Sequence, residues 1–504
     1  MSYTDFTAEL AAVSDLLSAI NLLNWDARTQ MPPDGAQTRS KQIATLTAIA
    51  RDAAASDRMK EIIARAEDAL SDAPKTDLRR RALAQARREI DILRRIPAAL
   101  ITETAELSAI SHSLWAKARA ADDFALFAPV IEKTFALQRS IAEAIGYDDH
   151  PYDALVSRYE PGMTRAKLRP LFDALRSGIA PLVDRARGAE VRTDFLSRGF
   201  PVAAQRAFGI KLAERMGYDM TRGRVDDTVH PFEISFTRQD VRITSRFRGD
   251  AISAGFFALW HEAGHGMYEQ NIAPEFTRSI FATDLVNLYA VGGTSFGAHE
   301  SQSRLWENRV GRSPRFWEHH YSELLAAFPD QLADVSVEEF WRAVNRAEPG
   351  LVRVEADELT YDMHIILRAE IEMALLTGDL SVADLPDAWA GKMRDYLGVT
   401  VPSDRLGVLQ DVHWSHGYVG SFPTYTIGNV MSAQFFEAAM AAPGVADGLV
   451  AGDYTELRAW LTEHVYRHGR SLLPDELLVS STGRSLDTAP YLAELSAKVD
   501  RLTA

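Results

Sequence analysis

Apolar residues recur at steps of three and four over most of this chain, which is the spacing of one face of an α-helix. The pattern is clearest in residues 40–145, which are rich in Ala, Arg, Glu and Leu and contain very few Gly or Pro residues. Pro and Gly interrupt it at residues 31–35, 159–162 and 348–350, but none of these breaks has the composition of a flexible linker. We therefore expect a mainly α protein.

Residues 232–247 depart from the helical pattern, because apolar and polar side chains alternate there as in a half-buried β-strand. Ile234 and Phe236 alternate in the first half, and Val241 and Ile243 in the second. We predict two short antiparallel strands joined by a turn. A free edge of this small sheet could pair with an extended peptide.

A helix is predicted over residues 251–270, which contain no Pro and follow the strand pair directly. Asp250 is expected to cap its first turn, because a carboxylate there can accept hydrogen bonds from free backbone N–H groups. The apolar positions have the spacing of a buried stripe: Ile252, Phe256, Leu259, Ala263 and Met267. The sheet therefore leads into a largely buried helix.

This helix carries the motif H-E-x-x-H, with His261, Glu262 and His265. Residues four apart share one face of a helix, so both imidazoles can reach one metal ion. The carboxylate of Glu262 can hold a proton beside a metal-activated water. The alternative, a pair of core histidines that hydrogen-bond to the backbone, stays open on the motif alone.

A catalytic zinc usually has three protein ligands and one open position, so a third ligand is needed. Glu300, in the run H-E-S-Q at 299–302, is the best candidate, although Glu307 and His299 could also bind. Glu269 lies on the same helix as the histidines and would approach at a poor angle. The alternative for Glu300 is a carboxylate at a helix N-terminus, where the helix dipole favours negative charge.

The composition narrows the chemistry further. The chain has no cysteine, so disulfides and thiolate ligands are excluded and a metal must bind His, Asp or Glu. A formal net charge of −15 argues against nucleic acid as a partner. No leader pattern and no uncharged apolar run of about 18 residues is present. We expect a soluble, cytoplasmic protein with no membrane contact.

Six ordered motifs resemble those of the M32 metallocarboxypeptidases, the carboxypeptidase Taq family of HExxH metallopeptidases, or gluzincins. They are H-P-F (230–232), D-V-R-I-T (240–244), H-E-A-G-H (261–265), H-E-S-Q (299–302), V-R-V-E-A-D (352–357) and G-V-L-Q-D-V-H-W (407–414). Segments 25–33 and 159–164 are also similar, so the resemblance covers nearly the whole chain. Two departures are Val352, where the family usually has Ile or Asn, and a longer segment between His265 and His299.

The resemblance implies a neurolysin-like fold, a single large helical domain with a deep groove and a small antiparallel sheet beside the HExxH helix. The domain would span residues 1–504, with a helical N-terminal part at about 1–225, a metal-site part at about 226–430 and C-terminal helices at about 431–504. A homodimer is also implied, as is one divalent metal ion per chain. Its ligands would be His261, His265 and Glu300. Zn²⁺ is the default metal, and Co²⁺ or Mn²⁺ accept similar ligands.

The resemblance also implies the residues that assist the reaction. Glu262 would act as the general base. The donor that stabilises the oxyanion would be one of His413 and His416, together with one of Tyr418 and Tyr425. The sequence does not choose between these pairs.

Arg353 is our first choice for binding the C-terminal carboxylate of a peptide substrate, because a guanidinium is planar and can bind a carboxylate through two hydrogen bonds. Arg242 is the second choice. The alternative for either arginine is a buried ion pair with a neighbouring acid, which would be Glu355 or Asp357 for Arg353 and Asp240 for Arg242. His230 and Gln410 would support the site without touching the reacting atoms.

These roles describe a metal-dependent carboxypeptidase that releases C-terminal amino acids, with broad specificity, from peptides and unfolded chains. The alternatives are a neurolysin-like oligoendopeptidase and a catalytically inactive, metal-bound, peptide-binding protein. The intact Glu262 argues against an inactive protein, because metal binding alone does not need this residue.

Overall fold

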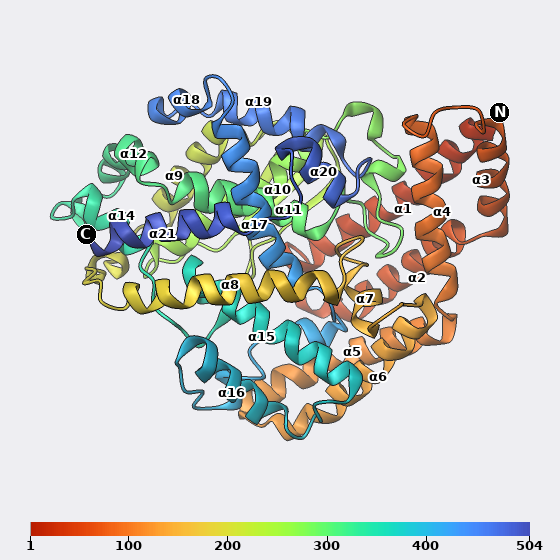
Figure 1. Cartoon of the computed structure of the whole chain (residues 1–504), viewed down its shortest axis with the longest axis horizontal. Coiled ribbons are helices and arrows are strands. Elements are labelled where there is room, and N and C mark those ends of the chain that lie inside the picture. Colours follow the sequence, from red (N-terminus) through yellow and green to blue (C-terminus); the bar gives the residue numbers. More distant parts are fainter. Residues whose placement is uncertain (1) are drawn as a thin grey trace. The chain divides into compact units, whose positions relative to one another are not determined.

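The computed structural model describes residues 2–504, without the side chains of Ser2 and Ser253. Helices make up most of the chain and one small sheet accompanies them, so the prediction of a mainly α fold is confirmed (Figure 1). The chain folds as two compact units, each built from three segments that lie far apart in sequence. The division of one domain into three successive parts stays a prediction.

The first unit consists of the chain up to Arg94, Arg192–Val344 and Met431–Leu486. Its α-helices are α1 (Ser2–Thr29), α2 (Ala36–Ala54), α3 (Asp57–Ala69), α4 (Leu78–Arg95), α9 (Val202–Met216), α10 (Ile252–Gln270), α11 (Phe296–Arg304), α12 (Pro314–Ala327), α13 (Pro329–Leu332), α14 (Val337–Val344), α18 (Val445–Ala451), α19 (Thr455–His464) and α20 (Pro474–Thr482). The short helices are η1 (Pro33–Gly35), η3 (Asp194–Ser197), η4 (Pro274–Phe276), η5 (Ile280–Ala282), the π-helix η6 (Leu305–Gly311) and η10 (Tyr466–His468).

The second unit consists of Arg95–Val191, Asn345–Val430 and Asp487–Ala504. Its α-helices are α5 (Ala98–Ala121), α6 (Ala128–Ile145), α7 (Pro151–Val156), α8 (Arg165–Ala186), α15 (Glu358–Thr377), α16 (Leu385–Leu397) and α21 (Ala489–Thr503), and its short helices are η2 (Phe124–Leu126), η7 (Arg353–Glu355), η8 (Asp404–Leu406) and η9 (His413–His416). Helices α8 and α21 lie side by side although they are distant in sequence (Figure 1). Helix α17 (Pro423–Met440) contains the boundary at Val430.

The sheet has the strand order β1-β3-β2. Strands β2 (Glu233–Thr237) and β3 (Asp240–Ser245) are antiparallel, which confirms the predicted strand pair. Strand β1 (Gly223–Asp227) pairs in parallel with β3 and was not predicted. Its sequence G-R-V-D-D has a single apolar residue and therefore no alternation that could reveal it.

The outer edge of β2 is covered by α1. The Ser18 hydroxyl donates to the carbonyl oxygen of Phe236 at 2.9 Å, and the Asn21 amide donates to that of Ser235 at 2.9 Å. These side chains use the carbonyl groups that an added strand would need. A peptide can therefore not pair with this part of β2 while α1 is in place.

By length and composition, α1 is the one helix among the described residues that could cross a membrane, from Tyr3 to Thr29. A core helix of a soluble protein passes the same test. The side chains of Phe6, Leu10 and Leu17 are at most 1% exposed. In this structure α1 is packed within the first unit, against α2, α3 and β2.

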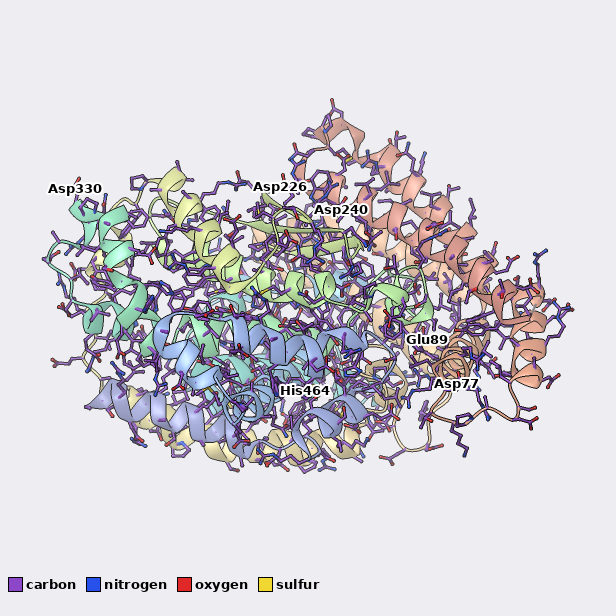
Figure 2. All side chains as sticks on the ribbon, turned by 90° about the horizontal axis from the view of Figure 1, so that it is seen from above. Asp77, Glu89, Asp226, Asp240, Asp330 and His464 are labelled. Carbon is purple, nitrogen blue, oxygen red and sulfur yellow. The ribbon has the colours of Figure 1, made fainter. Side chains whose placement is uncertain are left out.

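A buried ion pair joins the three segments of the first unit. Glu89 of α4, labelled in Figure 2, is 2% exposed. Its carboxylate accepts hydrogen bonds from the backbone N–H of Leu285 at 2.9 Å and from the guanidinium of Arg470 at 3.2 Å. Because an unpaired buried charge is costly, removal of either Glu89 or Arg470 would destabilise the junction of the three segments.

Helix α10 confirms the helix predicted over 251–270, and its five predicted stripe residues are fully buried. The helix packs against β3, α9, α11 and η6. The predicted cap by Asp250 is wrong. Ala251 is the N-cap residue, and the Asp250 carboxylate instead accepts two hydrogen bonds from Arg248, at 3.0 and 2.7 Å. A guanidinium two residues away offers this carboxylate a bidentate partner.

Gly264 allows α10 and α11 to approach closely. A methyl group at this position would overlap the carbonyl oxygen of Gln302 and lie 2.7 Å from the Cα atom of Ser303. Both atoms belong to the backbone of α11 and cannot rotate away. The two helices can therefore keep their spacing only with glycine here.

We predict that Gly264→Ala lowers the free energy of unfolding by about 1–3 kcal/mol, because α11 must move to make room. Gly391 is a matched control, since it lies inside α16 and its nearest atom, in Arg394, is 3.9 Å from the added methyl group. Gly391→Ala should raise the stability by up to about 1 kcal/mol through better helix propensity. Denaturant titration measures both changes, and equal stabilities of the two variants would contradict the prediction.

Candidate metal centre

The two imidazoles of the motif and the carboxylate of Glu300 converge beside α10. One ligand atom from each of His261, His265 and Glu300 lies within 4.8 Å of the other two. Nε2 of His265 is 3.2 Å from Oε2 of Glu300, and Nε2 of His261 is 3.6 Å from the same oxygen. Helix α10 thus presents two donors one turn apart, and α11 brings the third from the facing helix.

Glu307, an alternative third ligand in the sequence, lies behind His261. It belongs to η6, which continues α11 directly and in which π-helical turns replace α-helical ones. Its Oε2 is 3.0 Å from Nδ1 of His261. An imidazole that donates through Nδ1 to a carboxylate keeps its Nε2 lone pair for a metal. The geometry gives Glu307 the role of orienting a ligand.

The charges of this cluster favour a cation. Burial alone would raise the pKa of Glu300, but the charges of Arg304 and His261 hold it well below its usual range. Burial alone would lower the pKa of His261, but the carboxylates of Glu300 and Glu307 raise it to about 10. Two imidazoles and a carboxylate are a donor set that divalent metals such as zinc accept. The residues present therefore fit a metal ion.

Glu262 lies beside the donors on α10 and is 7% exposed. Among the described residues, none donates a hydrogen bond to its carboxylate. Burial raises its pKa to about 7, against the opposing charge of His261. A general base is most effective when its pKa lies near the working pH. The position of Glu262 and its raised pKa therefore both suit proton transfer.

Sequence reasoning missed Glu233, which lies on β2 and faces the same helix. Burial raises its pKa well above the usual range, and the carboxylates of Glu269 and Glu262 raise it further. A single Glu in a short strand carries no motif signal. Only the packing of β2 against α10 reveals that it lies among these acids.

A second polar cluster, in the second unit, contains Arg353. Its side chain is 8% exposed. Nε donates to Asp411 at 2.8 Å and Nη1 donates to the hydroxyl of Tyr361 at 3.1 Å. Arg353 thus forms its ion pair with Asp411. The acids that lie beside it in the sequence, Glu355 and Asp357, are not its partners.

Gln410 and a second arginine complete this cluster. Arg368 of α15 is fully buried and donates to Asp411 at 2.6 Å and to Gln410 at 2.7 Å. The same oxygen of Gln410 accepts the backbone N–H of Arg353 at 2.9 Å. Sequence reasoning missed Arg368, which lies on a face of α15 that also carries the buried polar residues His364 and Glu372.

The structure separates the candidate oxyanion donors into two pairs. Nε2 of His413 lies 3.3 Å from the hydroxyl of Tyr425, and both residues lie in the Arg353 cluster. His416 and Tyr418 are exposed, and their rings lie 5.8 Å apart. Burial and the nearby charge of Arg353 lower the pKa of His413 to about 3. Neutral His413 with Tyr425 is therefore the pair that suits hydrogen bonding in a buried site.

Arg242 and His230 are held by other contacts in the first unit. Arg242 donates two hydrogen bonds of 2.9 Å to Asp240, and its guanidinium lies 4.3 Å from the ring centre of Trp25. This is the ion-pair arrangement considered above, and it also packs α1 onto the sheet. His230 is exposed, and its carbonyl oxygen accepts a hydrogen bond of 3.5 Å from Arg28.

Comparisons with known proteins show the family of the chain. The family model described as carboxypeptidase Taq (M32) metallopeptidase matches residues 5–499. The chain is 40% identical to thermostable carboxypeptidase 1 of Thermus thermophilus over 98% of this chain and 96% of that protein. It is 37% identical to carboxypeptidase 1 of Bacillus subtilis over 99% and 98% of the two chains.

A solved structure gives the same result. The M32 carboxypeptidase from Deinococcus radiodurans R1 superposes with a TM-score of 0.94 and 39% identity, covering 100% of this chain and 99% of that chain. Family, curated relatives and fold agree over nearly the full length. The chain therefore belongs to the carboxypeptidase Taq (M32) metallopeptidase family and is a metal-dependent carboxypeptidase.

Proposed function

We propose that this enzyme holds one Zn²⁺ ion with His261, His265 and Glu300 and releases single C-terminal residues, with broad specificity, from peptides and unfolded chains. The observation that carries the proposal is the convergence of three donor atoms within 4.8 Å beside an unpartnered carboxylate. When bound, a divalent ion supplies Lewis acidity, which activates water and polarises a carbonyl group.

The residues of the chain supply the remaining steps. Glu262 takes a proton from the attacking water and then delivers it to the leaving amine. Its pKa of about 7 suits both directions of transfer. The resemblance to the family implies that Tyr425, whose hydroxyl lies 3.3 Å from Nε2 of His413, donates a hydrogen bond to the developing oxyanion. Arg353 binds the carboxylate of the substrate through the N–H groups of its guanidinium that Asp411 and Tyr361 leave available.

We further propose that the enzyme acts as a homodimer in the cytoplasm, without nucleic acid or membrane partners. The absence of cysteine and the net charge of −15 support this setting. The deep groove that the family resemblance implies would admit peptides and exclude folded chains.

Loss of the general base should lower turnover without loss of the metal. Glu262→Gln is expected to retain the metal content of the wild type and lose about 10²–10⁴-fold in kcat, because only proton transfer is impaired. Elemental analysis and turnover of a short peptide measure the two quantities. Glu214→Gln, an exposed position on α9, is the matched control and should change neither. A Glu262→Gln enzyme with full kcat would refute the assigned base.

Dependence on a free chain end tests the substrate class. A peptide with a free C-terminal carboxylate should lose one residue at a time, whereas its amidated form should persist, because the arginine then lacks a charged partner. Mass spectrometry of parallel digests measures both. Internal cleavage of both peptides would indicate an oligoendopeptidase, and metal binding without cleavage would indicate a peptide-binding protein.

The arginine that binds the C-terminal carboxylate of the substrate can be identified in the same assay. Arg353→Met should lower kcat/KM for the free peptide by roughly 10–100-fold, the value of a charge-assisted hydrogen bond. Asp411 keeps Arg368 as its partner in this variant, so the fold should persist. Arg242→Met is the comparison. A larger loss for Arg242→Met than for Arg353→Met would reverse the assignment.

A further inference from the structure

His299 does not join the three metal donors, although it precedes Glu300 in the chain. Both of its ring nitrogens are engaged elsewhere. Nδ1 lies 2.5 Å from Nδ1 of His265, and Nε2 lies 2.9 Å from Oε1 of Glu269. The two imidazole rings are inclined by only 21°, which suits an in-plane hydrogen bond between them. His299 thus connects a metal donor to a buried carboxylate.

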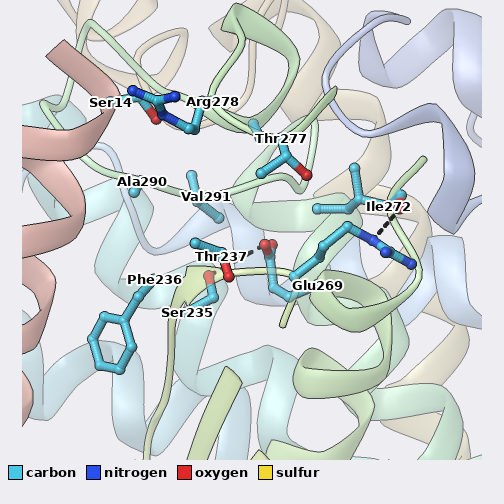
Figure 3. A pocket seen from close by; sticks show the side chains of 12 residues that line it. Ser14, Ser235, Phe236, Thr237, Glu269, Ile272, Thr277, Arg278, Ala290 and Val291 are labelled. Carbon is cyan, nitrogen blue, oxygen red and sulfur yellow. Dashed lines mark hydrogen bonds between the residues drawn. The ribbon is translucent and has the colours of Figure 1, made fainter. Parts of the chain in front are cut away.

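The surroundings of Glu269 decide which of these atoms carry protons. Its side chain is 4% exposed. The backbone N–H groups of Gly292 and Gly293 donate to it at 2.9 and 3.1 Å, and the hydroxyl of Ser235 donates at 3.2 Å. Figure 3 shows the Glu269 carboxylate directed toward Ser235 at the wall of a small pocket. Glu269 is therefore an acceptor, and Nε2 of His299 must be the donor to it.

The remaining tautomers follow in order. A neutral imidazole that donates through Nε2 can only accept through Nδ1. In the neutral form of His299, Nδ1 accepts a hydrogen bond from Nδ1–H of His265, which lies 2.5 Å away. His265 then has no proton on Nε2, which is the atom that faces Glu300 at 3.2 Å. The state required for a metal ligand is set before any ion arrives.

We propose that the His299–Glu269 pair is a positioning device that fixes the tautomer and ring orientation of His265 and so determines the metal affinity of the site. The proposal rests on the metal site of the proposed function. It gives the two histidine donors different supports, since His261 contacts the carboxylate of Glu307 directly and His265 reaches Glu269 only through a second imidazole.

The long segment before His299 is part of this device. A methyl group on Gly293 would overlap Cδ2 of His299, and one on Gly292 would overlap Ile272 and lie 3.2 Å from Oε2 of Glu269. Only glycine lets this backbone come close enough for its N–H groups to bind the carboxylate. The departure from the family pattern noted in the sequence thus lies next to a metal donor.

The first test measures the tautomers in the wild-type protein. In metal-free wild-type protein with ¹⁵N-labelled histidine, NMR should show His265 protonated at Nδ1 and His299 protonated at Nε2. The His265→Gln and His299→Gln variants assign the signals. The opposite tautomer at either residue would overturn the proposal, whatever the enzyme's activity.

The second test measures zinc affinity by chelator competition. Glu269→Gln should weaken zinc binding by about 10–100-fold, as losses of such supporting carboxylates do, and His265 should then populate both tautomers. Glu307→Gln should weaken zinc binding without changing the tautomer of His265, and Glu214→Gln should do neither. Thermal unfolding of the metal-free proteins checks that each variant is folded.

The outcomes separate this proposal from the proposed function. If wild-type protein binds no zinc, the metal site itself is refuted. If it binds zinc and Glu269→Gln retains full affinity with an unchanged His265 tautomer, the metal site stands and the role of the His299–Glu269 pair is refuted.

Discussion

The distance between helices α10 and α11 determines where the three metal donors can meet. Two donors stand on one helix and the third on the other, so a shift between the helix backbones moves Glu300 relative to both imidazoles. Gly264 sets this distance, because any side chain there would press on the backbone of α11. The fully buried stripe of α10 fixes the other side of the helix. The packing of α10 on α11 and the position of Glu300 relative to the two imidazoles therefore depend on the same close contact between the helix backbones.

The site also places several charged side chains in buried positions, and the acids that contact the metal donors have arginine partners. Arg304 donates to Glu300 at 2.8 Å, and Arg312 donates to Glu307 at 3.0 Å. Glu262 and Glu233 are exceptions: no described side chain donates to the carboxylate of Glu262, and Oε1 of Glu233 has no hydrogen-bond partner among the described residues. Because a buried unpaired carboxylate holds its proton more tightly, the isolation of Glu262 is what brings its pKa toward neutrality. Glu300 and Glu307 are fixed by their arginine partners, and Glu262, beside the metal donors, is suited to proton transfer.

Much of this arrangement could be read from residue spacing. The helix at 252–270 and the strand pair follow from hydrophobic period, and the shared face of His261 and His265 follows from the motif. That Glu300 joins them was implied by the resemblance to the family, because spacing alone left its role open. The failures have physical causes. Strand β1 lacks alternation of apolar and polar residues. The Asp250 carboxylate binds the guanidinium of Arg248 and does not cap the first turn of α10.

The other features of the site depend on tertiary contacts, which the sequence does not show. The sequence offered Glu307, Glu269 and His299 as rival ligands, and only the fold shows them behind the donors. Spacing along the chain could not separate the pair His413 and Tyr425 from the pair His416 and Tyr418, because both lie in one short aromatic segment and differ only in burial. Arg368 and Asp411 pair across 43 positions, beyond the reach of any local pattern.

The buried contact between Glu89 and Arg470 has a consequence for the timing of biosynthesis. The two residues are 381 positions apart. At a translation rate of about 5–20 residues per second, Arg470 is made roughly 20–75 seconds after Glu89. Arg470 also donates to the carbonyl oxygen of Gly293, whose N–H group binds Glu269. A ribosome-bound chain therefore cannot finish the surroundings of His265 until Arg470 has been made, and the nascent peptidase lacks a finished catalytic centre throughout the interval that separates Arg470 from Glu89.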